Sequence, residues 1–133
     1  MGQMEKAHTQ PLMSYKDLVV YQKAYRLALE IYRVTEGYPK DELYGLVSQM
    51  RRSSVSIPCN IAEGYRRGHV KEYVQFVWIA QGSCGELETL VSLSKDLGLM
   101  GQETFVDVYA RQDEVSRLLR GLISSLTRRD TRR

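Results

Sequence analysis

The polar residues most able to do chemistry in this chain lie in one stretch, residues 45–64, which otherwise has the pattern of a buried helix. The stretch contains Pro58, which removes a backbone hydrogen bond from a helix interior. It also carries four polar residues along one side: Arg52, Ser56, Asn60 and Glu63. Because buried polar groups are almost always hydrogen-bonded, these side chains either satisfy one another or form a binding site.

The structural alternative is a buried network that fixes the register between helices. In it Arg52 pairs with a carboxylate, Glu86 or Glu88, while Asn60 and Glu63 bond to the backbone of a neighbouring helix. The functional alternative is a binding groove lined by the same side chains. We favour the network, whose predicted members are Arg52, Ser56, Asn60, Glu63, Ser83 and Glu86.

Gly82 and Gly85 lie in the middle of another predicted helix, where each glycine costs about 1 kcal/mol relative to alanine. Close approach of a neighbouring helix would offset that cost. We expect the neighbour to be the region around Pro58.

The sequence lacks the residue patterns that the common classes of enzyme use. A di-iron bundle needs Glu-x-x-His pairs on two helices, but His8 lies in the N-terminal segment and His69 at a predicted turn. The chain has no P-loop, no dinucleotide-binding glycine pattern and no zinc-ligand spacing. Cys59 and Cys84 are predicted to be small, reduced core residues. We therefore expect no catalytic residue, no metal and no cofactor.

Basic residues are unevenly distributed, although the net charge is only +3. Residues 50–71 carry five cationic side chains against Glu63 alone, and residues 117–133 carry six arginines against Asp130 alone. Such patches suggest an anionic partner. The candidate nucleic-acid-binding residues are Arg51, Arg66, Arg67, Lys71, Arg128 and Arg129.

Two explanations remain open for Arg66 and Arg67. Tyr65 and His69 lie close by in the sequence, so rings that stack on bases adjoin cations that bind phosphates. Arginines at the C-terminal end of a helix also complement the helix dipole without any partner.

Turn residues divide the chain into four helices, so we predict an all-α fold. The helices are expected over residues 14 to about 36, 39 to 64 or 65, 69 to 97, and 102 to the terminal arginines. Short loops make neighbouring helices antiparallel, which gives an up-down four-helix bundle, and the 3.5-residue apolar repeat predicts left-handed packing. The predicted organisation is a flexible leader (1–13), the bundle (14–127) and a basic tail (128–133).

Two predicted helices are apolar on two sides and must be covered on two sides. The first has one row with Leu18, Tyr25, Leu29 and Tyr32, and another with Tyr21, Ala24, Ala28 and Ile31. The third has, beside its core row, Phe76, Ile79, Ser83, Glu86, Leu90, Leu93 and Leu97. The extra rows either widen the core or meet another copy, and we favour self-association.

No apolar run is long enough to span a membrane, and the first 13 residues lack the apolar segment of a secretion signal. We therefore expect a cytoplasmic protein without a membrane partner.

Several motifs occur in the order found in one bacterial family. They are Glu42-Leu-Tyr-Gly-Leu46, Gln49-Met-Arg-Arg52, Ser56-Ile-Pro-Cys-Asn-Ile-Ala-Glu-Gly64 and Ala80-Gln-Gly-Ser-Cys-Gly-Glu-Leu-Glu88. With Tyr15-Lys-Asp-Leu-Val-Val-Tyr21 and Leu118-Leu-Arg-Gly-Leu-Ile123, the chain resembles the four-helix-bundle proteins encoded in intervening sequences of large-subunit ribosomal RNA genes. Cys59 and the Cys84-Gly85 pair depart from the usual residues without threatening the fold.

The resemblance implies an up-down bundle that assembles into a homopentamer. It also implies similarity to the accessory protein of diversity-generating retroelements, a basic pentamer that binds reverse transcriptase and nucleic acid. We therefore expect a non-enzymatic homo-oligomer that binds RNA or a ribonucleoprotein through basic surface residues. The alternative is a protein-interaction scaffold or an accessory subunit of a nucleic-acid enzyme such as a reverse transcriptase.

Overall fold

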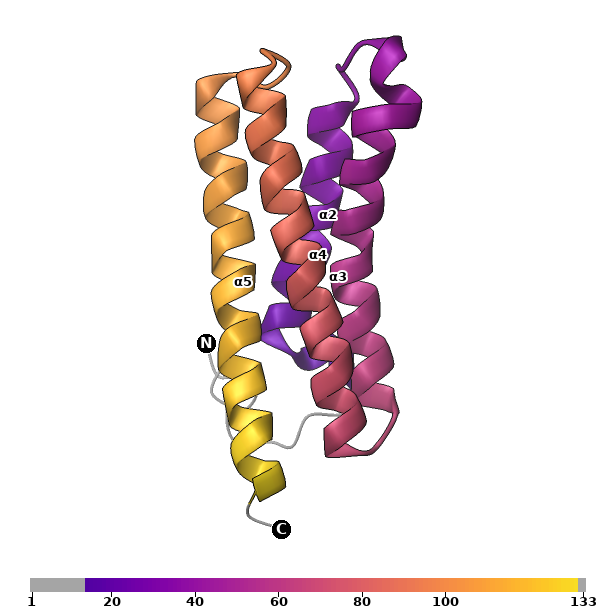
Figure 1. Ribbon diagram of the computed structural model, residues 1–133, viewed down its shortest axis with the longest axis vertical. Helices are drawn as coiled ribbons and strands as arrows, with labels where there is room; N and C mark the ends of the chain where they lie inside the picture. Colours follow the sequence, from indigo (N-terminus) through magenta and orange to yellow (C-terminus); the bar gives the residue numbers. More distant parts are fainter. Residues whose placement is uncertain (1–13, 132–133) are drawn as a thin grey trace, which may run out of the picture.

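The computed structural model describes residues 14–131, which form four long α-helices (Figure 1). They are α2 (Val19–Thr35), α3 (Ser48–Arg66), α4 (Val70–Asp96) and α5 (Gln102–Thr131). Consecutive helices run up and down, and α2 packs against α5 to close the bundle. No strand occurs between residues 14 and 131, so the all-α four-helix prediction is confirmed. The handedness of the packing stays a prediction.

The predicted leader, residues 1–13, lies outside the described residues, as do the last two residues of the predicted tail. Arg128 and Arg129, which also belong to that tail, are part of α5, because this helix continues to Thr131.

A capping box lies where the first helix is predicted to start, but it caps a shorter element. The Ser14 side chain accepts a hydrogen bond from the Lys16 amide at 3.0 Å, and the Ser14 amide donates to the Asp17 carboxylate at 3.2 Å. These bonds cap a 3₁₀ helix, η1 (Tyr15–Asp17). Leu18 is extended, with φ −73° and ψ 129°, so α2 begins only at Val19.

The second predicted helix is interrupted near its start. After Pro39 come a 3₁₀ helix, η2 (Lys40–Glu42), and a π-helical segment, η3 (Leu43–Val47). Gly45 has φ −111° and ψ −105°, which is not helical and which the absence of a Cβ makes accessible. The regular helix α3 therefore begins at Ser48 rather than at Pro39.

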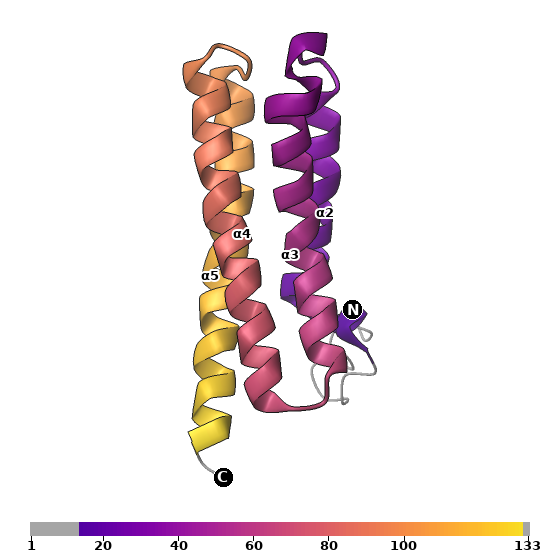
Figure 2. The same cartoon turned by 45° about the vertical axis from the view of Figure 1, so that its right-hand side comes forward.

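Two glycines make the sharp turns after α3 and α4. Gly68 has φ 78° and Gly98 has φ 79°, in the left-handed region that glycine enters without steric cost. Both turns lie where the sequence predicts them, and Figure 2 shows the α3–α4 turn at the end of the bundle opposite the α4–α5 turn.

The core is built from side chains on the 3.5-residue apolar repeat, and its fully buried members include Met50, Ile57, Ile61, Val77, Ala80, Leu87, Val91, Val108 and Leu119. On α2 the row containing Ala24, Ala28 and Ile31 is buried. The other rows remain partly uncovered: Tyr25, Leu29 and Tyr32 on α2, and Ile79, Leu93 and Leu97 on α4, are exposed.

The expected close approach at Gly82 and Gly85 is wrong, because a Cβ at either position would have no neighbour within 4 Å. The close approach lies instead at Gly64, near the end of α3. A Cβ there would lie 2.7 Å from the Phe76 Cβ and 3.2 Å from the Tyr73 carbonyl oxygen. Glycine at this position thus lets α3 and α4 come together just before their turn.

Candidate nucleic-acid interface

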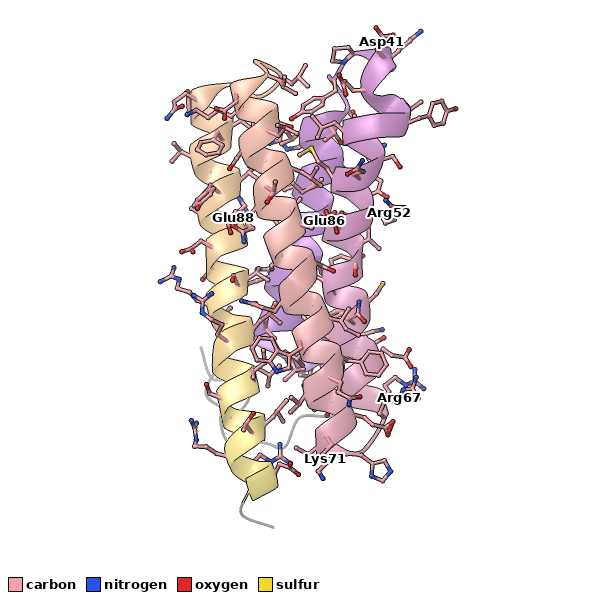
Figure 3. The ribbon with its side chains drawn as sticks, in the orientation of Figure 1. Asp41, Arg52, Arg67, Lys71, Glu86 and Glu88 are labelled. Carbon is pink, nitrogen blue, oxygen red and sulfur yellow. The ribbon has the colours of Figure 1, made fainter. Side chains whose placement is uncertain are left out.

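Three helix ends bring most of the predicted basic residues to one end of the bundle. The C-terminal ends of α3 and α5 and the N-terminal end of α4 lie there (Figures 1 and 2). We call the residues at this end the basic end: Arg66, Arg67, Lys71, Arg128 and Arg129. Figure 3 shows Arg67 and Lys71 on it, with Asp41 at the opposite end of the bundle.

Arg67 is the most constrained cation of the basic end. Its Nη2 lies 2.9 Å from a Glu63 carboxylate oxygen, and its Nη1 lies 3.9 Å from Glu72. Its guanidinium carbon also lies 5.0 Å from the centre of the Phe76 ring. These contacts hold the Arg67 side chain in place. The two carboxylates also neutralise part of its charge, so Arg67 adds less to the positive potential of the basic end than an unpaired arginine would.

Arg66 and Lys71 are exposed and have no ion-pair partner among residues 14–131. They are therefore available to an anion. Arg129 lies close enough to Tyr73 for its charge to favour the tyrosinate. Burial outweighs that charge and raises the pKa of the Tyr73 hydroxyl to about 12.

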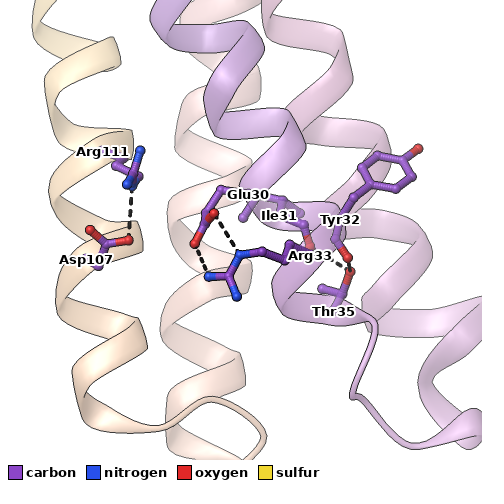
Figure 4. Close-up of polar contacts among 7 residues, drawn as sticks. All are labelled: Glu30, Ile31, Tyr32, Arg33, Thr35, Asp107 and Arg111. Atoms are coloured by element: carbon purple, nitrogen blue, oxygen red, sulfur yellow. Dashed lines mark hydrogen bonds and ion pairs between the residues drawn. The ribbon is translucent and has the colours of Figure 1, made fainter.

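Arg51 does not belong to the basic end. Its Nε donates to the Thr35 hydroxyl at 3.0 Å, and its Nη2 donates to the Tyr32 carbonyl at 3.4 Å. The guanidinium carbon lies 4.5 Å from the centre of the Tyr32 ring. Thr35 in turn donates to the Ile31 carbonyl at 2.7 Å (Figure 4). Arg51 therefore caps the C-terminal end of α2, where the last carbonyls lack helical partners.

The predicted polar network forms only in part. The hydroxyls of Ser56 and Ser83 lie 2.8 Å apart across α3 and α4, and the Asn60 amide nitrogen donates to the Ser56 hydroxyl at 3.0 Å. Asn60 also donates to the Ser56 carbonyl of its own helix, not to a neighbouring helix as expected.

The charged members lie outside this bonded group. Glu63 pairs with Arg67 on the surface, and Glu88 accepts a hydrogen bond from the Tyr109 hydroxyl at 3.0 Å. Arg52 and Glu86 are both exposed, and neither has an ion pair within residues 14–131 (Figure 3). The expected ion pair between Arg52 and Glu86 or Glu88 is therefore absent. An ion pair between exposed side chains gains too little free energy to hold both in one geometry.

A groove of about 640 Å³ between α2 and α3 was not foreseen from the sequence. Its lining includes Tyr15, Tyr21, Tyr25, Leu29, Tyr32, Val55 and Cys59. The exposed row on the first helix and the nine tyrosines in the chain were the available signals. Cys59 is exposed here, so its predicted place in the core is wrong, whereas Cys84 is buried as predicted.

Residues 14–131 contain neither a metal-binding cluster nor a membrane-spanning helix. No group of histidine, cysteine, aspartate and glutamate side chains there is arranged to hold a metal ion. No helix in this part of the chain combines the length and apolarity that a membrane crossing requires.

Comparison with a solved structure supports the architecture. A Bacteroides thetaiotaomicron protein of unknown function, from the S23 ribosomal protein family, is similar with a TM-score of 0.74. The two are 21% identical, and the match covers 80% of this chain and 96% of the other. No curated protein matches this chain.

The family described as 23S rRNA-intervening sequence protein matches residues 16–121, a region that begins in η1 and extends far into α5. It includes all the sequence motifs noted above except the last residues of the closing one and the first residue of the leading one. This chain therefore belongs to the 23S rRNA-intervening sequence protein family.

Proposed function

We propose that this protein is a non-enzymatic, homo-oligomeric helical bundle that binds RNA, free or within a ribonucleoprotein, through its basic end. One observation carries the proposal: three separate helix ends bring five cationic side chains together, and Arg66 and Lys71 among them have no ion-pair partner within residues 14–131. Clustered cations that lack partners are the electrostatic footprint of a protein that binds nucleic acid.

Two further observations support the proposal. The family is named after intervening sequences of 23S rRNA, which connects its members to RNA without stating what they bind. Near the basic end, the Tyr65 and Tyr73 rings lie 5.9 Å apart, so aromatic surface adjoins the cations. Aromatic rings beside cations are typical of sites for unpaired bases.

We also propose that the protein acts in the cytoplasm. Both of its cysteines are free, as expected in a reducing compartment.

Salt titration of binding to a structured RNA tests the proposal. Each phosphate contact contributes roughly 0.7–0.9 to the slope of log K against log salt. The double substitution Arg66→Ala with Lys71→Ala should therefore lower the affinity and reduce the slope by about 1.4 to 1.8.

Lys40→Ala is the matched control, because Lys40 is exposed in η2 at the opposite end of the bundle. Its affinity and salt slope should equal those of the wild type. Absence of binding even at low salt would reject the proposal. An equal effect of Lys40→Ala would reject the basic end as the site.

The groove between α2 and α3 favours a second candidate function, a scaffold or accessory subunit that binds a nucleic-acid enzyme such as a reverse transcriptase. Its exposed apolar lining is the kind of surface that protein partners cover. A reverse transcriptase gene beside this one would support the second candidate, and co-purification of the two products would test it.

A further inference from the structure

The groove between α2 and α3 presents apolar surface that nothing within residues 14–131 covers. Leu29 is 58% exposed, and Tyr25, Tyr32 and Val55 along the same groove are also exposed. Folded monomers rarely leave several large apolar side chains together in a concave surface. The only cation in the lining, Arg66, shares it with Glu63, so the groove is poorly suited to a polyanion such as RNA.

The outer side of α4 carries a second apolar surface, which we call the α4 ridge: Trp78, Ile79, Leu93 and Leu97. Ile79 is 51% exposed, and Gly82 and Gly85 lie between the two halves of the ridge with open space around them. Within residues 14–131 no contact offsets the cost of these two glycines in a helix interior. A neighbouring molecule on this face would do so.

The groove and the ridge lie on different faces of the bundle. The groove is formed by α2 and α3, whereas α4 packs chiefly against α3 and α5. α2 packs against α3 and α5 rather than against α4. A two-fold contact that pairs a surface with itself would cover one of the two surfaces and leave the other exposed. A head-to-tail contact covers both with one kind of interface.

We propose that the α4 ridge of one copy docks into the α2/α3 groove of the next copy. This inference deepens the homo-oligomeric part of the proposed function, on which it rests, by naming the two surfaces that meet.

The size of the two surfaces agrees with this occupant. A large aromatic side chain buries roughly 150–250 Å². Because the aliphatic members are smaller, four large side chains about half exposed leave at most roughly 300–500 Å² of apolar area on each face. Since non-polar area is about 56–58% of a typical interface, each copy would bury at most roughly 500–900 Å². The upper part of this range reaches the ~800 Å² per partner of a standard stable interface.

Three single substitutions test the contact in solution. Leu29→Glu places a charge in the groove, and Ile79→Glu places one on the ridge. Val106→Glu is the control, because Val106 is 55% exposed on α5 and outside both surfaces. Light scattering at micromolar concentration, without RNA, should give the wild type and Val106→Glu several times the 15.3 kDa chain mass. Leu29→Glu and Ile79→Glu should each give the chain mass, with unchanged helical circular dichroism.

Mixing the two defective variants separates head-to-tail from two-fold association. Leu29→Glu keeps an intact ridge and Ile79→Glu an intact groove, so an equimolar mixture should form a dimer of about twice the chain mass. If only Leu29→Glu blocks assembly, or if the mixture stays monomeric, the proposal is overturned.

Cys59 provides a second measurement, which reports on the groove directly. Cys59 is exposed in the groove, whereas Cys84 is buried, and burial raises the pKa of the Cys84 thiol to about 12. Maleimide should therefore label Cys59 and leave Cys84 unmodified. Labelling of the wild-type assembly should be roughly tenfold or more slower than labelling of Ile79→Glu, because the thiol reacts from the dissociated fraction.

Equal labelling rates would overturn the docking. So would a wild type that is monomeric and whose Cys59 is protected only when RNA is added, which would assign the groove to nucleic acid. A wild type that assembles by ridge and groove but binds no RNA would instead reject the RNA part of the proposed function alone.

Discussion

At the scale of single residues, Gly64 and Gly121 give opposite predictions for the same substitution. A Cβ at Gly64 would lie 2.7 Å from the Phe76 Cβ, between helices that cannot separate without losing core contacts. Gly64→Ala should therefore lower the free energy of unfolding by about 1–3 kcal/mol through overpacking. At Gly121, within α5, a Cβ meets nothing within 4 Å, so Gly121→Ala should raise it by about 0.5–1 kcal/mol.

Urea unfolding followed by circular dichroism measures both changes. Both substitutions add the same methyl group to a helix. The difference between their effects on the free energy of unfolding therefore measures the cost of the close approach at Gly64. A stabilising Gly64→Ala would mean that α3 and α4 can move apart there at no cost.

At the scale of the elements, Arg51 is predicted to hold two helices together rather than to bind RNA. It donates to Thr35 and to the Tyr32 carbonyl, and so joins the end of α2 to α3. Arg51→Ala should lower the free energy of unfolding by about 1–2 kcal/mol, since it removes a hydrogen bond to a charged group. The salt slope of RNA binding should not change.

The neighbouring residue supplies the control. Arg52 is exposed and has no ion pair within residues 14–131, so Arg52→Ala should alter stability by less than about 0.5 kcal/mol. The same urea titrations report both variants. If Arg51→Ala changes the free energy of unfolding as little as Arg52→Ala does, and also weakens RNA binding, then Arg51 belongs to the RNA-binding surface.

Element type and core could be predicted because they follow from periodicity and turn residues. Met50, Ile57 and Ile61 lie on the 3.5-residue apolar repeat and are buried, and Gly68 and Gly98 make the turns between the predicted helices. Breaks such as the one at Gly45 could not be predicted, because a 3₁₀ turn, a π segment and an α-helix start with similar local sequences.

The partners of polar and small residues were harder to predict than the helices. Gly82 and Gly85 lie in the middle of a predicted helix and Gly64 at the end of one, and only the packing of α3 on α4 shows that Gly64 is the crowded one. Arg52 and Glu86 have suitable charges and spacing, yet exposed ion pairs are too weak to fix a side chain. For the candidate site, charge clustering indicated the basic residues, but only the fold separates Arg51 from the others.

At the scale of the whole molecule, stability should fall in alkaline solution. Burial raises the pKa of the Cys84 thiol from 9.0 to about 12, and burial likewise raises the pKa of Tyr73 from 10.0 to about 12. Above pH 9 the unfolded chain therefore loses protons that the folded chain keeps, so rising pH favours unfolding. The stabilisation is fully present below pH 9 and is lost progressively as pH rises towards 12.

Urea midpoints measured between pH 8 and pH 11 test this sign and its origin. Each group contributes at most about 1.4 kcal/mol per pH unit, so the decline should steepen once Tyr73 joins Cys84 above pH 10. Cys84→Ala should flatten the decline that begins near pH 9, and Tyr73→Phe should flatten only the part above pH 10. A wild type whose stability is level up to pH 11 would show that the bundle opens enough to hydrate both groups, and that the core around Cys84 is not closed in solution.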